Sequence, residues 1–253
     1  MAVEPLAHDV AGDGPGLVLV HGVTFNRRTW DPIVSRLAER FRCLVVDLPG
    51  HGESTGSGAD PVATVERIHA TSEAVGLQTP IVLGHSAGAL VATGYAAMHP
   101  VAGVVNVDQS LRVGPFASFV QQLAPALSGP GFADAFTPFR QSIGVDQLPE
   151  PERTRVLATQ RVDQQTVLDH WTKPLHDSPE QLQEEVNGLL EAVVAPYLWL
   201  VGSEPAREDV DLLRAHLRGP LQVECWPGTG HMVHLSDPER FSALVAKFAG
   251  VAP

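Results

Sequence analysis

The fold is decided by the stretch Pro80-Ile81-Val82-Leu83-Gly84-His85-Ser86-Ala87-Gly88-Ala89-Leu90. A short apolar run ends there in the pattern G-x-S-x-G, and a helical stretch of small residues follows. This pattern predicts a sharp strand-to-helix turn with Ser86 at its tip. The residues two before and two after the serine come close together, and Gly84 and Gly88 have no side chain to clash there. The free amide of Ala87 would begin the helix, where it can bind a developing oxyanion.

Composition limits the class of protein. The chain has 253 residues, 44% of them hydrophobic, which suits one large α/β domain with an insertion or two small domains. The net charge of −12 argues against nucleic acid or an anionic membrane as a partner. Cys43 and Cys225 suggest neither a disulfide framework nor a zinc site. Residues 1–15 lack signal-peptide features and no stretch could span a bilayer, so we expect a cytoplasmic protein, with a homodimer left open.

Apolar runs alternate with helical patterns in the first 110 residues and again from residue 196. Besides the run before Ser86, strands are predicted at 6–10, 17–20, 43–46, 101–107, 197–201 and 221–226. Helices are predicted at 29–41, 61–75, 209–217 and 238–248, and from Ser86 to Met98. This alternation implies right-handed crossovers and a mostly parallel sheet flanked by helices. His21, Asp47, Ser86 and Asp108 each follow a strand, at the edge where open α/β sheets bind ligands.

The segment 111–195 has a different pattern, with helical segments and no convincing strand. The candidates are 116–127, 131–143, 150–161, 166–171 and 178–194. We therefore predict a helical cap at 111–195, inserted into an α/β core formed by 1–110 and 196–253. The cap carries six large aromatic residues, which we expect to pack mainly against the sheet domain, with a few lining an apolar cavity at the seam: Phe116, Phe119, Phe132, Phe136, Phe139 and Trp171.

Four landmarks occur in a characteristic order. They are His21-Gly22, the run Asp47-Leu48-Pro49-Gly50-His51-Gly52-Glu53-Ser54, the turn at 84–88, and Gly230-His231 followed by His234-Leu235 and Asp237-Pro238. With these landmarks the chain resembles the α/β-hydrolase fold superfamily, in its lid-bearing group of esterases and related enzymes. The resemblance covers nearly the whole chain and is weakest in the cap. It implies the α/β-hydrolase fold and a Ser-His-acid triad.

The candidate catalytic residues follow from the chemistry of the serine. A serine hydroxyl is a poor nucleophile until a base takes its proton. His231 follows the last strand on a Gly-rich loop, downstream of Ser86, as the order Ser…acid…His requires. For the acid, the resemblance favours Glu204, the first carboxylate after the strand 197–201. Asp108 is the alternative, because some members of the superfamily take their acid from the position after the preceding strand.

Two backbone amides are expected to form the oxyanion hole. One belongs to Ala87, and the resemblance places the other at Val23, after His21-Gly22. Val23-Thr24-Phe25 replaces the glycine-rich sequence of some lipases, which predicts a narrower acyl site. His231 and His234 form an H-x-x-H pair, but no glutamate-bearing helix or cysteine accompanies it. We therefore expect no metal and no cofactor.

These residues predict acyl transfer to water through an acyl-enzyme. The expected substrate is a small to medium, mainly apolar carboxylic ester. A lactonase, an amidase, a carbon–carbon bond hydrolase or a perhydrolase would carry the same residues. A non-catalytic ligand receptor on the same fold is the alternative from another class, because fold does not fix function. Serine at the turn argues against dehalogenase and epoxide hydrolase chemistry, since the resemblance implies an aspartate there for those enzymes.

Overall fold

The structure is a computed structural model that describes residues 4–250, so the first three residues of the segment 1–15 lie outside it. Within this range, seven strands form one sheet in the order β1-β3-β2-β4-β5-β6-β7. Their bounds are β1 His8–Ala11, β2 Gly16–Val20, β3 Arg42–Val46, β4 Ile81–His85, β5 Gly103–Val107, β6 Tyr197–Val201 and β7 Leu221–Cys225. Only β1 runs antiparallel to its neighbour, so the predicted, mostly parallel sheet is confirmed.

The strand register explains why distant polar residues meet at one edge. Val20 of β2 lies beside Gly84 of β4, and Val107 of β5 lies beside both His85 and Leu200. The residues that follow these strands therefore emerge next to one another at the carboxyl edge of the sheet. Because the chain alternates strand and helix, each crossover returns to start the next parallel strand at the opposite edge.

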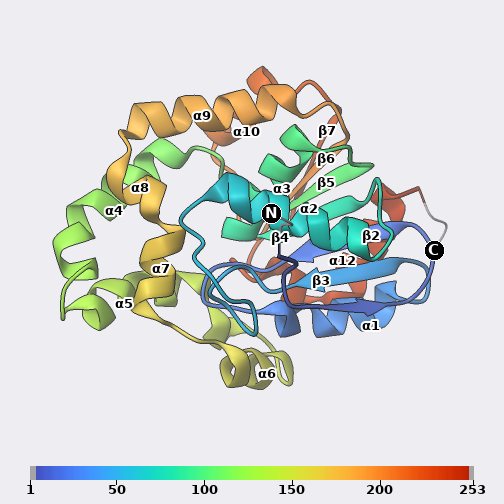
Figure 1. Cartoon of the computed structure of the whole chain (residues 1–253), viewed down its shortest axis with the longest axis horizontal. Coiled ribbons are helices and arrows are strands. Elements are labelled where there is room, and N and C mark those ends of the chain that lie inside the picture. The colour runs from blue at the N-terminus through green and yellow to red at the C-terminus, as the bar shows by residue number, and fades with distance from the viewer. Residues whose placement is uncertain (1–3, 251–253) are drawn as a thin grey trace.

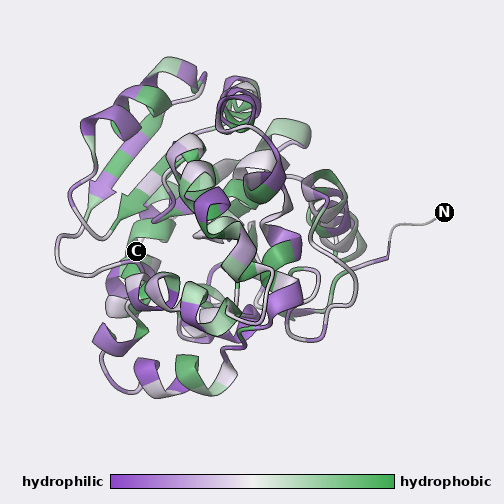
Figure 2. Ribbon diagram, turned by 90° about the vertical axis from the view of Figure 1, so that its left-hand side faces the viewer, coloured by the Kyte–Doolittle hydropathy of each residue, from purple (hydrophilic) through white to green (hydrophobic). Residues whose placement is uncertain are grey.

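Helices cover both faces of the sheet (Figure 1). Helices α1 (Asp31–Leu37) and α12 (Pro238–Phe248) pack on one face, and α2 (Pro61–Ala74), α3 (Ala87–Met98) and α10 (Arg207–His216) pack on the other. Along β2, Leu17 and Leu19 enter one cluster of buried residues while Val18 and Val20 enter the other. The central strands are therefore apolar on both faces. Figure 2 shows green stretches along the strands that are visible beside the cap.

One predicted helix is divided. The pattern at 29–41 predicts a single helix, but the structure has a 3₁₀ helix, η1 (Arg27–Trp30), followed by α1. Pro32 lies in the first turn of α1, where its missing N–H leaves no hydrogen bond unmade. Inside one continuous helix the missing N–H would leave the carbonyl oxygen of Arg28 without its α-helical donor, so a new helix begins at Asp31, which is itself helical with φ of −49° and ψ of −46°.

Helices α4 to α9 lie between β5 and β6 and project to one side of the sheet (Figure 1). Their bounds are α4 Val113–Leu127, α5 Phe132–Ile143, α6 Glu152–Thr159, α7 Gln164–His170, α8 Thr172–His176 and α9 Pro179–Ala192, with a 3₁₀ helix, η2, at Val145–Gln147. The sequence patterns miss α8, η2 and the four-residue helix α11 (Val233–Ser236). In the described range no helix is long and apolar enough to cross a membrane.

The cap aromatic residues do not pack mainly against the sheet. Phe132, Phe136 and Trp171 are buried with Val120 and Val167 in a cluster that contains cap residues only. The expectation that these rings would pack against the sheet domain is therefore wrong, because the cap helices bury them against one another. Helices α9 and α4 also reach the main core cluster, α9 through Leu182, Val186 and Leu190 and α4 through Val113 and Ala117 at its start. The division at residues 111–195 stays a prediction.

Candidate active site

Ser86 lies between β4 and α3 in a strained backbone conformation. Its φ is 53° and its ψ is −129°, a region that residues with a side chain rarely occupy. The reversal needs close contact between backbone segments. A Cβ atom on Gly84 would lie 2.1 Å from the carbonyl oxygen of Gly88, and one on Gly88 would lie 2.5 Å from that of His21. Glycine is therefore required on both sides, and the turn leaves the Ser86 side chain partly exposed.

His231 pairs with Asp108. Its Nδ1 atom donates a hydrogen bond to Oδ2 of Asp108 over 2.7 Å, and both side chains are largely buried. The other carboxylate oxygen accepts a hydrogen bond from the amide of Gly202 over 2.8 Å. Asp108 itself has a φ of 57°. With Nδ1 protonated, Nε2 of His231 is left as the basic nitrogen, which is the arrangement that a general base for a serine requires.

The preference for Glu204 as the partner of His231 is corrected by this contact. Glu204 is exposed, and its Oε2 atom lies 3.9 Å from the Sγ atom of Cys225. Asp108 follows β5 directly, next to β6, and Gly202 after β6 fixes its orientation. Glu204 follows two residues later, after the chain has turned toward solvent. The placement of Asp108 at the end of a buried strand was visible in the sequence, but the turn after β6 was not.

The structure brings the loop of His231 beside the turn of Ser86. Nε2 of His85 donates a hydrogen bond to the carbonyl oxygen of His231 over 3.0 Å, and the two rings lie 4.8 Å apart. Burial holds the pKa of His85 well below its ordinary value, so the ring is neutral. No hydrogen bond joins Ser86 and His231, both of which the structure describes. Such bonds are often long in free enzymes and shorten in the substrate complex.

The two expected oxyanion donors lie on either side of Ser86. Ala87 is the first residue of α3. On the other side, a Cβ atom on Gly22 would lie 3.0 Å from Cβ of Ser86. The carbonyl oxygen of Gly22 accepts hydrogen bonds from the Phe25 amide and from Nδ1 of His21, over 3.2 Å and 2.8 Å. Because the Val23 amide belongs to the same peptide unit as this carbonyl, its N–H points the opposite way.

Two neutral histidines fix the loops behind the site. Nε2 of His21 accepts from the amide of Leu48 over 3.0 Å, and Nε2 of His51 accepts from that of Thr24 over 3.1 Å. Burial lowers the pKa of His21 to about 3. Burial and the neighbouring His21 and His170 lower the pKa of His51 to about 2. Both rings therefore remain acceptors at any working pH. The contact of His51 with Thr24 could not be predicted from the sequence.

A buried ion cluster organises the loop after β3. Asp47 is fully buried and accepts hydrogen bonds from the backbone and side chain of Arg27 and from the amide of Glu53. A Cβ atom on Gly52 would lie 2.1 Å from the Asp47 carboxylate, so only glycine fits there. Burial disfavours the charge of Arg27, but Glu53, Asp9 and Asp47 together raise its pKa above its ordinary value. The ion cluster thus anchors η1 to the loop that carries His51.

His234 does not line a substrate pocket. It is fully buried, with its ring 4.6 Å from that of His85 and 4.7 Å from that of Trp30. Burial lowers its pKa to about 3. Among the described residues, no group of three or more His, Cys, Asp or Glu side chains is arranged to hold a metal ion.

The cap covers the site from above. A Cβ atom on Gly230 would lie 3.3 Å from Oε1 of Gln147 in η2, so η2 lies over the loop of His231. Core and cap share a buried apolar cluster here: Phe25, Ile143, Val145, Leu148, Val156, Met232 and Leu235. The two residues next to the site on the core side, Phe25 and Met232, are therefore held in an apolar seam.

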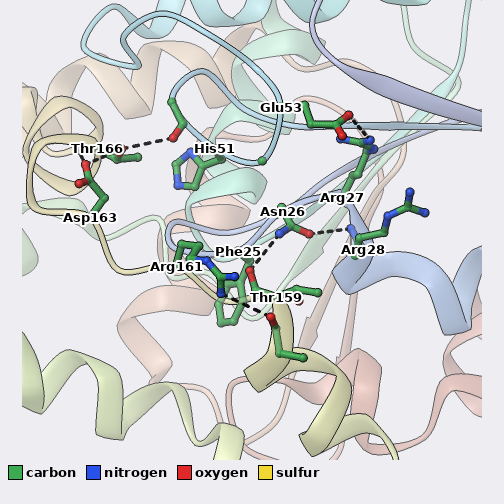
Figure 3. A pocket seen from close by; sticks show the side chains of 13 residues that line it. Phe25, Asn26, Arg27, Arg28, His51, Glu53, Thr159, Arg161, Asp163 and Thr166 are labelled. Carbon is green, nitrogen blue, oxygen red and sulfur yellow. Dashed lines mark hydrogen bonds and ion pairs between the residues drawn. The ribbon is translucent and has the colours of Figure 1, made fainter.

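A polar cavity of about 410 Å³ lies beside the site, between the core loops and the cap (Figure 3). Its walls come from three segments, 25–28, 50–53 and 158–166. Phe25 and His51 belong to its lining, whereas the turn of Ser86 does not. The cavity therefore marks the seam where the linker from α6 to α7 meets the core.

The fold and the site define an α/β enzyme scaffold with a serine at its strand-to-helix turn and a His–Asp pair beside it. Residues 17–244 match the model of the Alpha/beta hydrolase family. The chain belongs to this family, and the predicted α/β-hydrolase fold is confirmed.

The chain is also similar to individual members. It is 30% identical to the pimeloyl-[acyl-carrier protein] methyl ester esterase of Yersinia enterocolitica, over 98% of both chains. A solved structure of a hydrolase from Pseudomonas aeruginosa matches 97% of this chain and 94% of that one, with a TM-score of 0.77 and 20% identity. A thermophilic esterase from Thermogutta terrifontis matches 96% of this chain and 92% of that one, with a TM-score of 0.72 and 22% identity. The two solved structures support the fold alone.

Proposed function

We propose that the protein is a serine hydrolase that cleaves small to medium, mainly apolar carboxylic esters through a Ser86-His231-Asp108 triad. The observation that carries the proposal is the bond between Nδ1 of His231 and Asp108, on a loop fastened beside Ser86 by His85. A carboxylate in this position fixes the tautomer of the imidazole and stabilises the imidazolium that forms during catalysis.

In the proposed reaction Ser86 attacks the ester carbonyl and His231 takes its proton. The amides of Val23 and Ala87 hold the oxyanion. His231 then gives the proton to the leaving alcohol, and an acyl-enzyme remains. Water, activated by the same histidine, attacks this acyl group and releases the acid and Ser86.

Two observations favour an apolar ester with a small alcohol. The seam above the site is apolar on both the core and the cap side. The relative from Yersinia enterocolitica is named for a methyl ester of a pimeloyl group on acyl carrier protein. For this protein we propose the same class of ester only, in which a short alcohol is joined to a medium-length acyl chain.

The test compares the wild type with Ser86→Ala on p-nitrophenyl esters of increasing acyl length and on methyl esters of the same acids. We expect wild-type turnover that peaks at short to medium chains and a loss of activity in Ser86→Ala. Full activity in Ser86→Ala would overturn the proposal. Slow turnover with tight binding of the acid would favour a ligand receptor instead.

A further inference from the structure

Among the described residues, positive φ values outside glycine are confined to the site. In the described range they occur at Ser86, Asp108 and Thr24, with φ of 71° at Thr24. Such backbone strain gathers where surrounding structure holds a functional geometry in place. Ser86 and Asp108 belong to the proposed triad, whereas Thr24 has no role in the reaction described so far. It directly follows Val23, one of the two expected oxyanion donors.

Thr24 occupies the critical corner of a turn. The amide of Phe25 donates to the carbonyl oxygen of Gly22 over 3.2 Å, which closes a four-residue turn from Gly22 to Phe25. Among these residues, only the third has the positive φ that a type II turn requires, and glycine usually fills that position. A β-branched threonine there is strained. If Thr24 relaxed, the turn would change, and with it the peptide unit that aims the Val23 amide.

Every polar group of Thr24 is held by another residue. Its amide donates to Nε2 of His51 over 3.1 Å, and its carbonyl oxygen accepts from the amide of Arg161 over 3.0 Å. Its hydroxyl oxygen accepts from Nε2 of Gln160 over 3.2 Å. Thr24 is 1% exposed, so water does not replace these partners easily. Two of the three partners belong to the linker between α6 and α7.

The end of α6 also lies alongside the turn. Nδ2 of Asn26 donates to the carbonyl oxygen of Thr159 over 3.0 Å, and Figure 3 shows Thr159 and Arg161 beside Phe25 and Asn26. Besides the apolar seam, the cap therefore contacts the loop that follows Val23 by hydrogen bonds from the end of α6 and from the linker after it. These bonds exist only while the linker lies against the core.

From this arrangement, and resting on the proposed function, we infer that Gln160 is a positioning residue that keeps the Val23 amide aimed into the oxyanion hole by holding Thr24 in its strained conformation. Seating of the cap linker would thus complete the site. Gln160 does not touch the reacting atoms. Its effect passes through Thr24 and the turn, so it should act on the transition state and leave substrate binding nearly unchanged.

The test begins with Gln160→Ala and Thr24→Val, which remove the two ends of one hydrogen bond. We expect each to lower kcat on the best p-nitrophenyl ester about 3- to 10-fold, the size of one hydrogen bond's net contribution, with KM changed less than about twofold. Since both act on one bond, the double variant should be no slower than the slower single variant. The inference would be overturned if the fold-loss of kcat in the double variant equalled the product of the two single losses, or if kcat in Gln160→Ala were unchanged.

Two further variants separate positioning from a general structural role. Gln165→Ala, which removes an exposed glutamine bonded to Asp169 within α7, should leave kcat unchanged. In Thr24→Gly the turn needs no support, because glycine adopts positive φ freely. Adding Gln160→Ala to Thr24→Gly should therefore change kcat less than about twofold. A loss as large as in the wild-type background would contradict the role of Thr24.

A crystal structure of Gln160→Ala makes the outcome independent of turnover. We expect Thr24 to leave its positive φ and the peptide between Gly22 and Val23 to turn. If both stay in place, the inference is wrong whatever the kinetics show. If they move but ester hydrolysis does not depend on Ser86, the positioning role stands and the proposed function fails.

Discussion

The Nδ1 atom of His231 lies 2.7 Å from Oδ2 of Asp108, although 123 positions separate the two residues in the chain. The second oxygen of the same carboxylate is held by the amide of Gly202, which follows β6. Three neighbouring strand ends thus build the pair: β5 carries Asp108, β6 leads to Gly202, and β7 leads to His231. This relationship decides between two carboxylates that the sequence left open.

The first prediction concerns the acid. Asp108→Asn should lower kcat for ester hydrolysis by about 10⁴-fold, because the amide cannot fix the imidazole tautomer or stabilise its cation. Glu204→Gln is the matched control. Because Glu204 is exposed, this substitution should lower kcat less than about twofold. Steady-state kinetics with the two variants side by side decides the question. A larger loss from Glu204→Gln would restore Glu204 as the acid.

The second prediction compares two helical glycines, Gly88 of α3 and Gly188 of α9. A Cβ atom on Gly88 would lie 2.5 Å from two backbone oxygens, whereas one on Gly188 would meet nothing within 4 Å. Gly88→Ala should therefore prevent stable folding or lower the free energy of unfolding by about 3 kcal/mol. Gly188→Ala should raise it by about 0.5–1 kcal/mol, the helix-propensity difference. Urea unfolding of both variants measures this, and equal effects would contradict the close packing at the turn.

The third prediction separates strain from catalysis at Ser86. Ser86→Gly and Ser86→Ala should both lose activity, but only glycine is relaxed at φ 53°. The free energy of unfolding of Ser86→Gly should therefore be about 1 kcal/mol higher than that of Ser86→Ala. Glycine relieves about 1–3 kcal/mol of backbone strain, which outweighs the greater chain entropy it gives the unfolded state. Urea or thermal unfolding at pH 7.5 provides the comparison. Equal stability would mean that the turn stores little strain.

The fourth prediction concerns pH. The pKa values of His21, His51 and His234 fall from 6.5 to about 3, about 2 and about 3 because burial disfavours the charged ring. Below pH 6.5 the unfolded chain binds protons at these rings that the folded protein does not bind. Their contribution to the free energy of unfolding is therefore fully present above pH 6.5 and is lost as the pH falls toward 3. At pH 5.5 each ring therefore lowers the free energy of unfolding by about 1.4 kcal/mol.

Together these three rings should make the protein about 4 kcal/mol less stable at pH 5.5 than at pH 7.5, and the lowered pKa values of His85 and His170 add to this loss in the same direction. Urea unfolding at the two pH values measures this difference. Replacing an exposed histidine, as in His176→Gln, should leave the difference unchanged. A pH difference below about 1 kcal/mol would mean that these rings are charged in the folded protein.

Most of the fold could be predicted from the sequence, because its central strands are buried on both faces. Runs such as 17–20 and 197–201 are apolar at every position, which distinguishes them from the helices around them. The turn at Ser86 was predictable for the same local reason, since close backbone contact demands Gly84 and Gly88. The cap was harder to predict, because short helices such as α8 are stabilised by neighbours that are distant in the chain.

The sequence by itself determined the sheet, the position of Ser86 and the loop that carries His231, because these depend on apolar periodicity and on glycine. The tertiary structure alone decided that Asp108 partners His231 and that Gln160 reaches Thr24. Both contacts join loops whose course is set by packing and hydrogen bonds between distant segments. A hydrogen bond of about 3 Å needs a placement that no local sequence pattern specifies.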